Sequence, residues 1–148
     1  MTTAPIETGL GDVAVADAMH VGVLSCPPET ALRDVARMMT RFGVHAVVVS
    51  TEDAEADEAI GLWGVVADDD LVAAAAVGDL DGRTAGGTAR TPLVSVYPHE
   101  SLQRAAELMK ERRVTHLLVL SPDSERPFGI VSTLDLARAI ASEPLGPA

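Results

Sequence analysis

The chain contains 148 residues, of which 47% are hydrophobic and 22% charged, enough for one domain that buries about two-thirds of its unfolded surface. Its net charge of −11 argues against a nucleic-acid partner, and its single cysteine, Cys26, excludes an internal disulfide or a multi-cysteine zinc site. Because no apolar run approaches the about 20 residues that span a bilayer and the N-terminus does not resemble a signal peptide, we expect a cytoplasmic protein without a membrane partner.

The first half of the chain predicts the order strand, helix, strand, strand, helix. Apolar or β-branched runs predict the strands, and apolar residues spaced three or four apart predict the first helix. The run at 45–49 is continuously apolar, which is typical of a strand covered on both sides. The expected elements are Val21–Ser25, Thr30–Phe42, His45–Val49, Leu62–Val66 and Asp68–Val77.

The second half repeats this order after a glycine-rich stretch. Residues 79–87 are expected to be a linker between a first motif at 13–78 and a second at 88–143, with flexible ends at 1–12 and 144–148. The second set of elements is expected at Leu93–Val96, Ser101–Arg112, His116–Leu120, Phe128–Val131 and Thr133–Ser142.

The two halves also share sequence. The pattern that begins at Leu32 returns at Leu102, and the stretch from Gly64 to Leu71 corresponds to that from Gly129 to Leu136. A repeat of this length predicts two paired units, because neither buries its apolar face alone. Residues 1–75 hold 13 acidic and three basic residues, a net charge of −10, whereas residues 76–148 hold nine and eight, a net charge of −1. A phosphate-bearing ligand should therefore prefer the second half.

This tandem order, with Gly-Ile-Val-Ser-Thr-Leu-Asp-Leu at 129–136 before the last helix, resembles a pair of CBS domains, the cystathionine-β-synthase type. The resemblance implies an α/β (α+β) fold in which two β-α-β-β-α motifs pack through a pseudo-two-fold axis into one Bateman-type module. It also implies a stand-alone regulatory protein, not an enzyme, that needs no cofactor and forms a homodimer. Its ligand would be AMP, ADP, ATP or S-adenosylmethionine, bound in a cleft between the motifs, and its effector would be a separate, unknown protein.

The start of the last helix suits such a ligand. Ser132 and Asp135 lie where backbone N–H groups lack intrahelical partners. A carboxylate there can accept hydrogen bonds from both hydroxyls of a ribose diol. By resemblance, Ser132, Thr133 and Asp135 match the ribose-phosphate motif, and Thr91, Pro92 and Leu93 match a stretch that touches adenosine. The cations expected to meet phosphate are Arg90, Arg112, Arg113 and His116.

The first half supports a second cleft less well. Its expected residues are Val21, Val23, His45 and Asp70. Ala67 stands where a hydroxyl is expected, and the carboxylates at 68–70 would repel phosphate. We interpret these carboxylates as solvated helix caps and not as metal ligands.

Simpler interpretations remain open. Ser132-x-x-Asp135 is also a capping box, which would explain both residues without a ligand. His45 and His116 are more typical of structural histidines than of acid-base groups. A second functional hypothesis is a ligand-independent homodimeric scaffold that pairs through small residues at 73–77 and 137–141.

Overall fold

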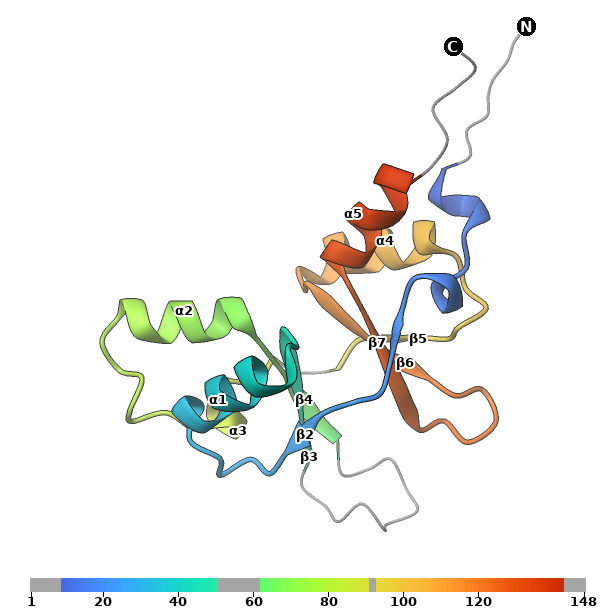
Figure 1. Ribbon diagram of the computed structural model, residues 1–148. Helices are drawn as coiled ribbons and strands as arrows, with labels where there is room; N and C mark the ends of the chain where they lie inside the picture. The colour runs from blue at the N-terminus through green and yellow to red at the C-terminus, as the bar shows by residue number, and fades with distance from the viewer. Residues whose placement is uncertain (1–8, 51–61, 91–92, 143–148) are drawn as a thin grey trace, which may run out of the picture. The chain divides into compact units, whose positions relative to one another are not determined.

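The computed structural model describes residues 9–50, 62–90 and 93–142 (Figure 1). These residues form a mixed α/β structure that divides into two compact units. The first unit contains the described residues up to Gly22 and those from Val94 onward, and the second contains those between Val23 and Leu93.

The first unit is built on a four-stranded sheet of order β1-β7-β6-β5. Strands β5 and β6 are parallel, whereas β6 and β7, and β7 and β1, are antiparallel. Helices α4 and α5 pack against each other and against β6 and β7, respectively. The elements are η1 (Leu10–Asp12), η2 (Val15–Asp17), β1 (His20–Val21), β5 (Ser95–Val96), α4 (Leu102–Arg112), β6 (His116–Leu120), β7 (Pro127–Ser132) and α5 (Thr133–Ser142).

The second unit has a three-stranded sheet of order β2-β3-β4. As in the first unit, a short strand runs parallel to the central strand, and the third strand is antiparallel to it. The elements are β2 (Ser25–Cys26), α1 (Leu32–Phe42), β3 (Ala46–Ser50), β4 (Leu62–Ala67), α2 (Asp68–Ala76) and α3 (Ala85–Thr88).

The hydrophobic periodicity predicted these elements because the apolar positions of the sequence are the positions that the fold buries. The three middle residues of β6 are all buried, as are the first four of β3, so both continuous apolar runs are strands covered on both faces. In α4 the buried positions include Leu102, Ala105 and Met109, which lie on one face of the helix. Apart from the first strand of the first half, the expected α-helices and strands are present, and each boundary lies within two residues of the predicted one.

The expected strand Val21–Ser25 is wrong as a single element. Gly22 adopts φ +107°, a conformation that L residues rarely take, and divides the segment. The part before it, β1, pairs with β7 in the first unit, and the part after it contributes β2 to the other sheet. The segment before Gly22 therefore packs with elements from the second half of the sequence.

Two expected irregular segments also contain structure. The stretch at 79–87, expected to be a linker, includes the start of α3, whose residue Ala85 is fully buried in the core of the second unit. At the N-terminus, expected to be flexible up to residue 12, η1 packs against α4. The stretch at 79–87 suggested a linker because it is rich in glycine and alanine. Such small residues allow close packing as well as a bend, and a Cβ on Gly86 would lie 2.7 Å from the Pro28 side chain.

Candidate ligand site at the start of helix α5

Asp135 is the centre of the candidate site, and one of its carboxylate oxygens is used by the fold. The side chain is 2% exposed. Its Oδ2 accepts hydrogen bonds from the Ser132 backbone N–H at 2.8 Å and from Ser132 Oγ at 3.0 Å. Ser132 Oγ in turn accepts from the Asp135 backbone N–H at 3.3 Å. The capping box is therefore present, and it stabilises the start of α5.

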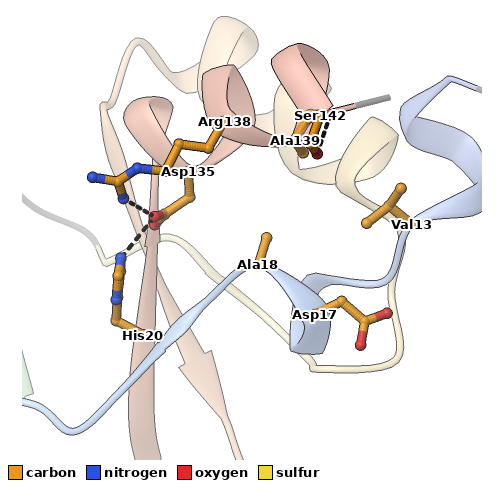
Figure 2. A pocket seen from close by; sticks show the side chains of 8 residues that line it. All are labelled: Val13, Asp17, Ala18, His20, Asp135, Arg138, Ala139 and Ser142. Atoms are coloured by element: carbon orange, nitrogen blue, oxygen red, sulfur yellow. Dashed lines mark hydrogen bonds and ion pairs between the residues drawn. The ribbon is translucent and has the colours of Figure 1, made fainter. Parts of the chain in front are cut away.

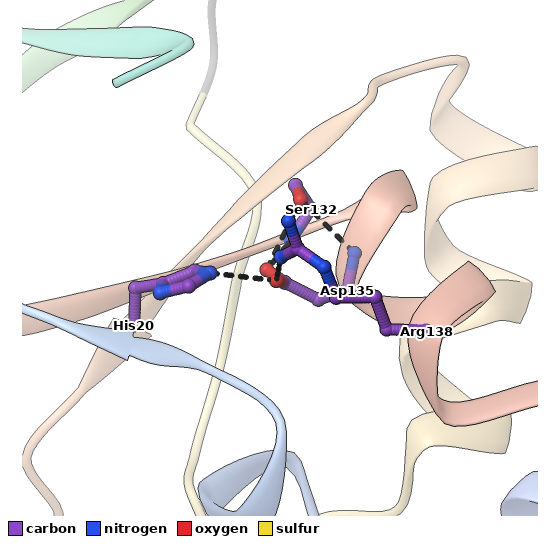
Figure 3. A network of polar contacts seen from close by, with 4 residues as sticks. All are labelled: His20, Ser132, Asp135 and Arg138. Carbon is purple, nitrogen blue, oxygen red and sulfur yellow. Dashed lines mark hydrogen bonds and ion pairs between the residues drawn. The ribbon is translucent and has the colours of Figure 1, made fainter. Parts of the chain in front are cut away.

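The second carboxylate oxygen, Oδ1, faces two basic side chains (Figure 3). His20 Nε2 lies 2.8 Å from Oδ1, and Arg138 Nη1 lies 3.3 Å from it. Both basic side chains are largely exposed, at 67% and 61%. A buried carboxylate requires such partners because an unpaired charge away from water is costly.

A glycine allows His20 to reach this oxygen. In the β1–β7 pairing, His20 is opposite Ile130 and Val21 is opposite Gly129. A Cβ on Gly129 would lie 2.7 Å from the His20 carbonyl oxygen, closer than real side chains approach. Gly129 thus permits β1 to lie against β7 and places the imidazole beside Asp135.

A cavity of about 500 Å³ opens beside this network (Figure 2). It lies between the segment that leads into β1 and helix α5, and Asp135, His20 and Arg138 are at one end of it. Its volume is in the range of small-molecule sites. The lining residues are Val13, Asp17, Ala18, His20, Asp135, Arg138, Ala139 and Ser142.

Several residues of the expected ribose-phosphate set lie together. His116 is opposite Ser132 in the β6–β7 pairing, so both are at the sheet edge where α5 begins. His116 Nδ1 is 2.9 Å from Thr115 Oγ1, and the Thr133 N–H donates to the Thr115 carbonyl at 3.0 Å. The structure therefore groups His116, Ser132, Thr133 and Asp135, of which only Asp135 lines the cavity.

The other expected contacts are placed differently. Arg112 is the last residue of α4, and Arg113 follows it in the left-handed conformation; both are exposed. Leu93 is half-buried and belongs to the second unit. Thr91 and Pro92 lie outside the described residues.

The second unit contains a related arrangement around Asp70. This aspartate is 7% exposed, and its Oδ2 accepts from the Ala67 N–H at 2.8 Å. Its Oδ1 accepts from Arg90 Nε at 3.0 Å, and Arg90 Nη2 is also 3.6 Å from Asp69 Oδ2. Because alanine has no hydroxyl, only one half of the capping box exists here.

The remaining residues of the weaker expected set do not gather around Asp70. His45 Nδ1 lies 3.0 Å from Asp68 Oδ2, at the exposed start of α2. Val21 is 76% exposed on β1 in the first unit, and Val23 begins the second unit.

The sequence interpretation missed His20 and Arg138. Arg138 lies three residues after Asp135, a spacing at which helical side chains meet. His20 and Arg90 are separated by the same number of residues as Leu32 and Leu102, so they occupy equivalent positions of the repeat. A basic residue that recurs at this position was the sequence signal that could have pointed to His20.

Two further findings concern sites that the described residues do not form. Within 9–50, 62–90 and 93–142, no three His, Cys, Asp or Glu residues gather as ligands of one metal ion would. Over the same ranges, no helix has the length and apolar character of a membrane span. The cytoplasmic location remains a prediction.

Comparison with known proteins identifies the family. The profile of the CBS domain matches residues 15–77 and, a second time, residues 79–142. The chain belongs to the CBS domain family. Since residues 15–20 fall in the first matched motif and α5 in the second, both CBS motifs contribute residues to the cavity at Asp135.

Two relatives are similar over most of the chain. The CBS domain-containing protein YhcV of Bacillus subtilis is 28% identical over 125 residues, which are 84% of this chain and 83% of the relative. Hypoxic response protein 1 of Mycobacterium tuberculosis is 29% identical over 124 residues, which are 82% of this chain and 81% of the relative.

Solved structures of CBS domain pairs share the fold. The pair of protein MJ0100, in complex with 5′-methylthioadenosine and S-adenosyl-L-methionine, has a TM-score of 0.72 at 16% identity, covering 89% of this chain and 98% of that one. CBSX2 in complex with AMP has a TM-score of 0.61 at 24% identity, covering 87% and 96%. The CBS domain of a bacterial CNNM/CorC family Mg²⁺ transporter, in complex with ATP, has a TM-score of 0.68 at 22% identity, covering 91% and 92%.

Proposed function

We propose that this CBS-domain protein is a regulatory module that binds an adenosine compound in the cavity beside Asp135 and modulates a separate partner protein. The observation that carries the proposal is the position of Asp135: a buried carboxylate with one oxygen committed to the helix cap and the other at the end of a cavity of about 500 Å³. The adenosine compounds bound by the solved CBS pairs support the choice of ligand class.

The lining suits the parts of such a compound. Asp135 Oδ1 can accept hydrogen bonds from a ribose diol. Val13, Ala18 and Ala139 provide an apolar wall against which a purine can pack. The exposed guanidinium of Arg138 can meet the phosphate of AMP or ATP or the carboxylate of S-adenosylmethionine.

The same geometry offers a route to regulation. The cavity is lined by the segment leading into β1 on one side and by α5 on the other. A compound that fills the cavity favours the packing of these two elements that accommodates it, and a partner that contacts either element can respond. In this proposal the chain itself is not an enzyme, and it regulates the partner protein.

A thermal-shift series tests the proposal. Purified protein is heated with AMP, ADP, ATP or S-adenosylmethionine, with and without Mg²⁺. A compound present at 100 times its dissociation constant stabilises the folded state by about 2.7 kcal/mol, which raises the melting temperature by several degrees.

Asp135→Asn is the informative variant, because its amide oxygen can still accept from the Ser132 N–H while the negative charge is lost. Asp123→Asn, at an exposed turn, is the matched control. The proposal predicts a shift in the wild type and the control but not in Asp135→Asn. It is wrong if no compound shifts the wild type at millimolar concentration, or if Asp135→Asn responds equally.

Exposed apolar side chains favour a second candidate, a homodimeric scaffold that acts without a ligand. On α5, Leu134 and Ile140 are 46% and 58% exposed, and at α2, Val72 and Val77 are 68% and 66% exposed. Such residues favour contact with a second copy of the chain. If Ile140→Glu turns a dimer into a monomer in sedimentation analysis while no adenosine compound binds, the scaffold function is supported instead.

A further inference from the structure

The two buried aspartates receive a basic side chain from equivalent places in the repeat. His20 corresponds to Arg90, and Asp70 corresponds to Asp135. His20 is opposite Ile130 in a strand pairing, and Arg90 forms an isolated bridge with Val65, the repeat equivalent of Ile130. Each unit thus places a basic residue beside the strand that leads to its own aspartate.

Each aspartate also divides its oxygens in the same way. Oδ2 accepts from the backbone N–H three residues earlier, that of Ala67 or Ser132, at 2.8 Å in both units. Oδ1 lies against the basic residue: Asp70 Oδ1 accepts from Arg90 Nε at 3.0 Å, and Asp135 Oδ1 lies 2.8 Å from His20 Nε2. The oxygen that a ribose diol would use is therefore already occupied by a group of the protein.

The two basic residues differ in how strongly they can hold that oxygen. An arginine can contact two carboxylates at once through its guanidinium fork, and that of Arg90 reaches a second carboxylate, that of Asp69. His20 makes one contact, through an imidazole whose side chain is 67% exposed, and shares Oδ1 with Arg138. Because the imidazole of this contact lies largely in solvent, its hold on Oδ1 is weakened by screening although the carboxylate itself is buried.

We propose that His20 and Arg90 are intramolecular competitors of the ligand and decide which of the two aspartates accepts a ribose. This inference rests on the proposed function. Displacement of His20 from Asp135 Oδ1 by the hydroxyls of an adenosine compound has a small cost, so the site at Asp135 fills. Displacement of Arg90 breaks contacts with two carboxylates, so the site at Asp70 stays closed.

Calorimetric titration with adenosine as the probe tests this inference. Adenosine has the diol but no phosphate, so the loss of the imidazole cannot weaken its binding through a phosphate contact. His20→Ala should bind adenosine roughly fivefold more tightly than the wild type, the factor that corresponds to about 1 kcal/mol for a polar contact that no longer competes. His20→Gln, which keeps a side-chain hydrogen-bond donor near Oδ1, should fall between the two.

Three controls complete the design. His99→Ala removes an exposed histidine elsewhere in the first unit and should leave the affinity unchanged. With 2′,3′-dideoxyadenosine, which lacks the diol, His20→Ala should give no gain. Arg90→Ala should raise the stoichiometry from one adenosine per chain to two.

The outcomes separate the two proposals. If the wild type binds adenosine and His20→Ala binds it equally or more weakly, competition by His20 is wrong while the proposed function stands. If Arg90→Ala still binds one adenosine, the explanation for the closed site at Asp70 is wrong. If no variant binds adenosine or any compound of the thermal-shift series, the proposed function and this inference both fail.

Discussion

At the scale of single residues, Asp135 combines a structural role with a proposed binding role. Its Oδ2 caps α5, and its Oδ1 accepts from Arg138 Nη1 at 3.3 Å and lies 2.8 Å from His20 Nε2. The capping box and the ligand interpretation of Ser132 and Asp135 are therefore compatible, because they use different oxygens of one carboxylate.

We expect Asp135→Ala to lower the free energy of unfolding by about 1–3 kcal/mol, because it removes a buried acceptor of several hydrogen-bond donors. Asp135→Asn should cost less, since it retains the cap. Urea denaturation followed by circular dichroism measures both, with the exposed Asp123→Ala as control at under about 0.5 kcal/mol. Equal losses in Asp135→Ala and the control would contradict the structural role.

Cys26 provides a pH-dependent prediction. The thiol forms no disulfide, and the residue is 5% exposed. Burial raises the pKa of the thiol above its usual value, and a hydrogen bond with the Thr30 side chain lowers the pKa by a smaller amount. The folded thiol therefore keeps its proton to higher pH than the unfolded one. Its contribution to stability is complete below about pH 8.5 and declines as the pH rises further.

The urea midpoint of the wild type should accordingly fall between about pH 7.5 and about pH 9.5 by more than that of Cys26→Ala, which has no thiol to titrate. Equal declines in the two proteins would show that the thiol proton is not coupled to folding. This residue needs no functional interpretation, because the thiol is part of the core of the second unit.

Asp135 and Ser132 could be predicted from a local pattern in the sequence, whereas the signal for His20 was only that a basic residue, Arg90, stands at the equivalent position of the repeat. The first two belong to a local pattern, a helix start with a hydroxyl and a carboxylate three residues apart. His20 reaches the site through the pairing of β1 with β7, a contact between segments from opposite halves of the chain. Local periodicity carries no information on such pairing.

At the scale of elements, helices α1 and α4 are equivalent in the repeat, but their N-terminal caps differ. Helix α4 is capped by Ser101, whose Oγ accepts from the Arg104 N–H at 3.1 Å. The equivalent position before α1 is Ala31, which has the same extended backbone conformation but no side-chain acceptor. The two halves thus supply a natural pair for measuring one cap.

We predict that Ser101→Ala lowers the free energy of unfolding by about 1 kcal/mol and that Ala31→Ser raises it by a similar amount. Chemical denaturation of the two single variants and of the double variant measures these effects, and the double variant should be close to the wild type. A loss of stability in Ala31→Ser would show that the start of α1 differs from that of α4 in more than its side chain.

Strand and helix positions were predictable where burial follows a regular period, as in α4 and β6. They were not predictable where one glycine redirects the chain. Gly22, with a φ of +107°, splits an apolar segment into strands of two sheets. The stretch at 79–87 shows the converse, since its glycines and alanines also fill a close contact in the core.

At the scale of the whole molecule, the two halves share a fold but differ in the polar residues around the buried aspartate. Both units place a buried aspartate at the start of a closing helix. Only the first adds a serine hydroxyl to the cap and a histidine to the carboxylate, and the second has three consecutive aspartates and an arginine instead. The proposed sites are therefore unequal, which is why one molecule of ligand per chain is expected.

An amide chemical-shift titration of the ¹⁵N-labelled protein with AMP tests this account most directly. We predict saturable shifts at the residues around Asp135, from Gly129 to Arg138 and at His20, with much smaller shifts from Val65 to Leu71. The same titration of Asp135→Asn should show no saturable shifts in either region. Saturable shifts confined to the start of α2, or none at millimolar AMP, ADP, ATP and S-adenosylmethionine, would contradict the assignment of the cavity beside Asp135 as the ligand site.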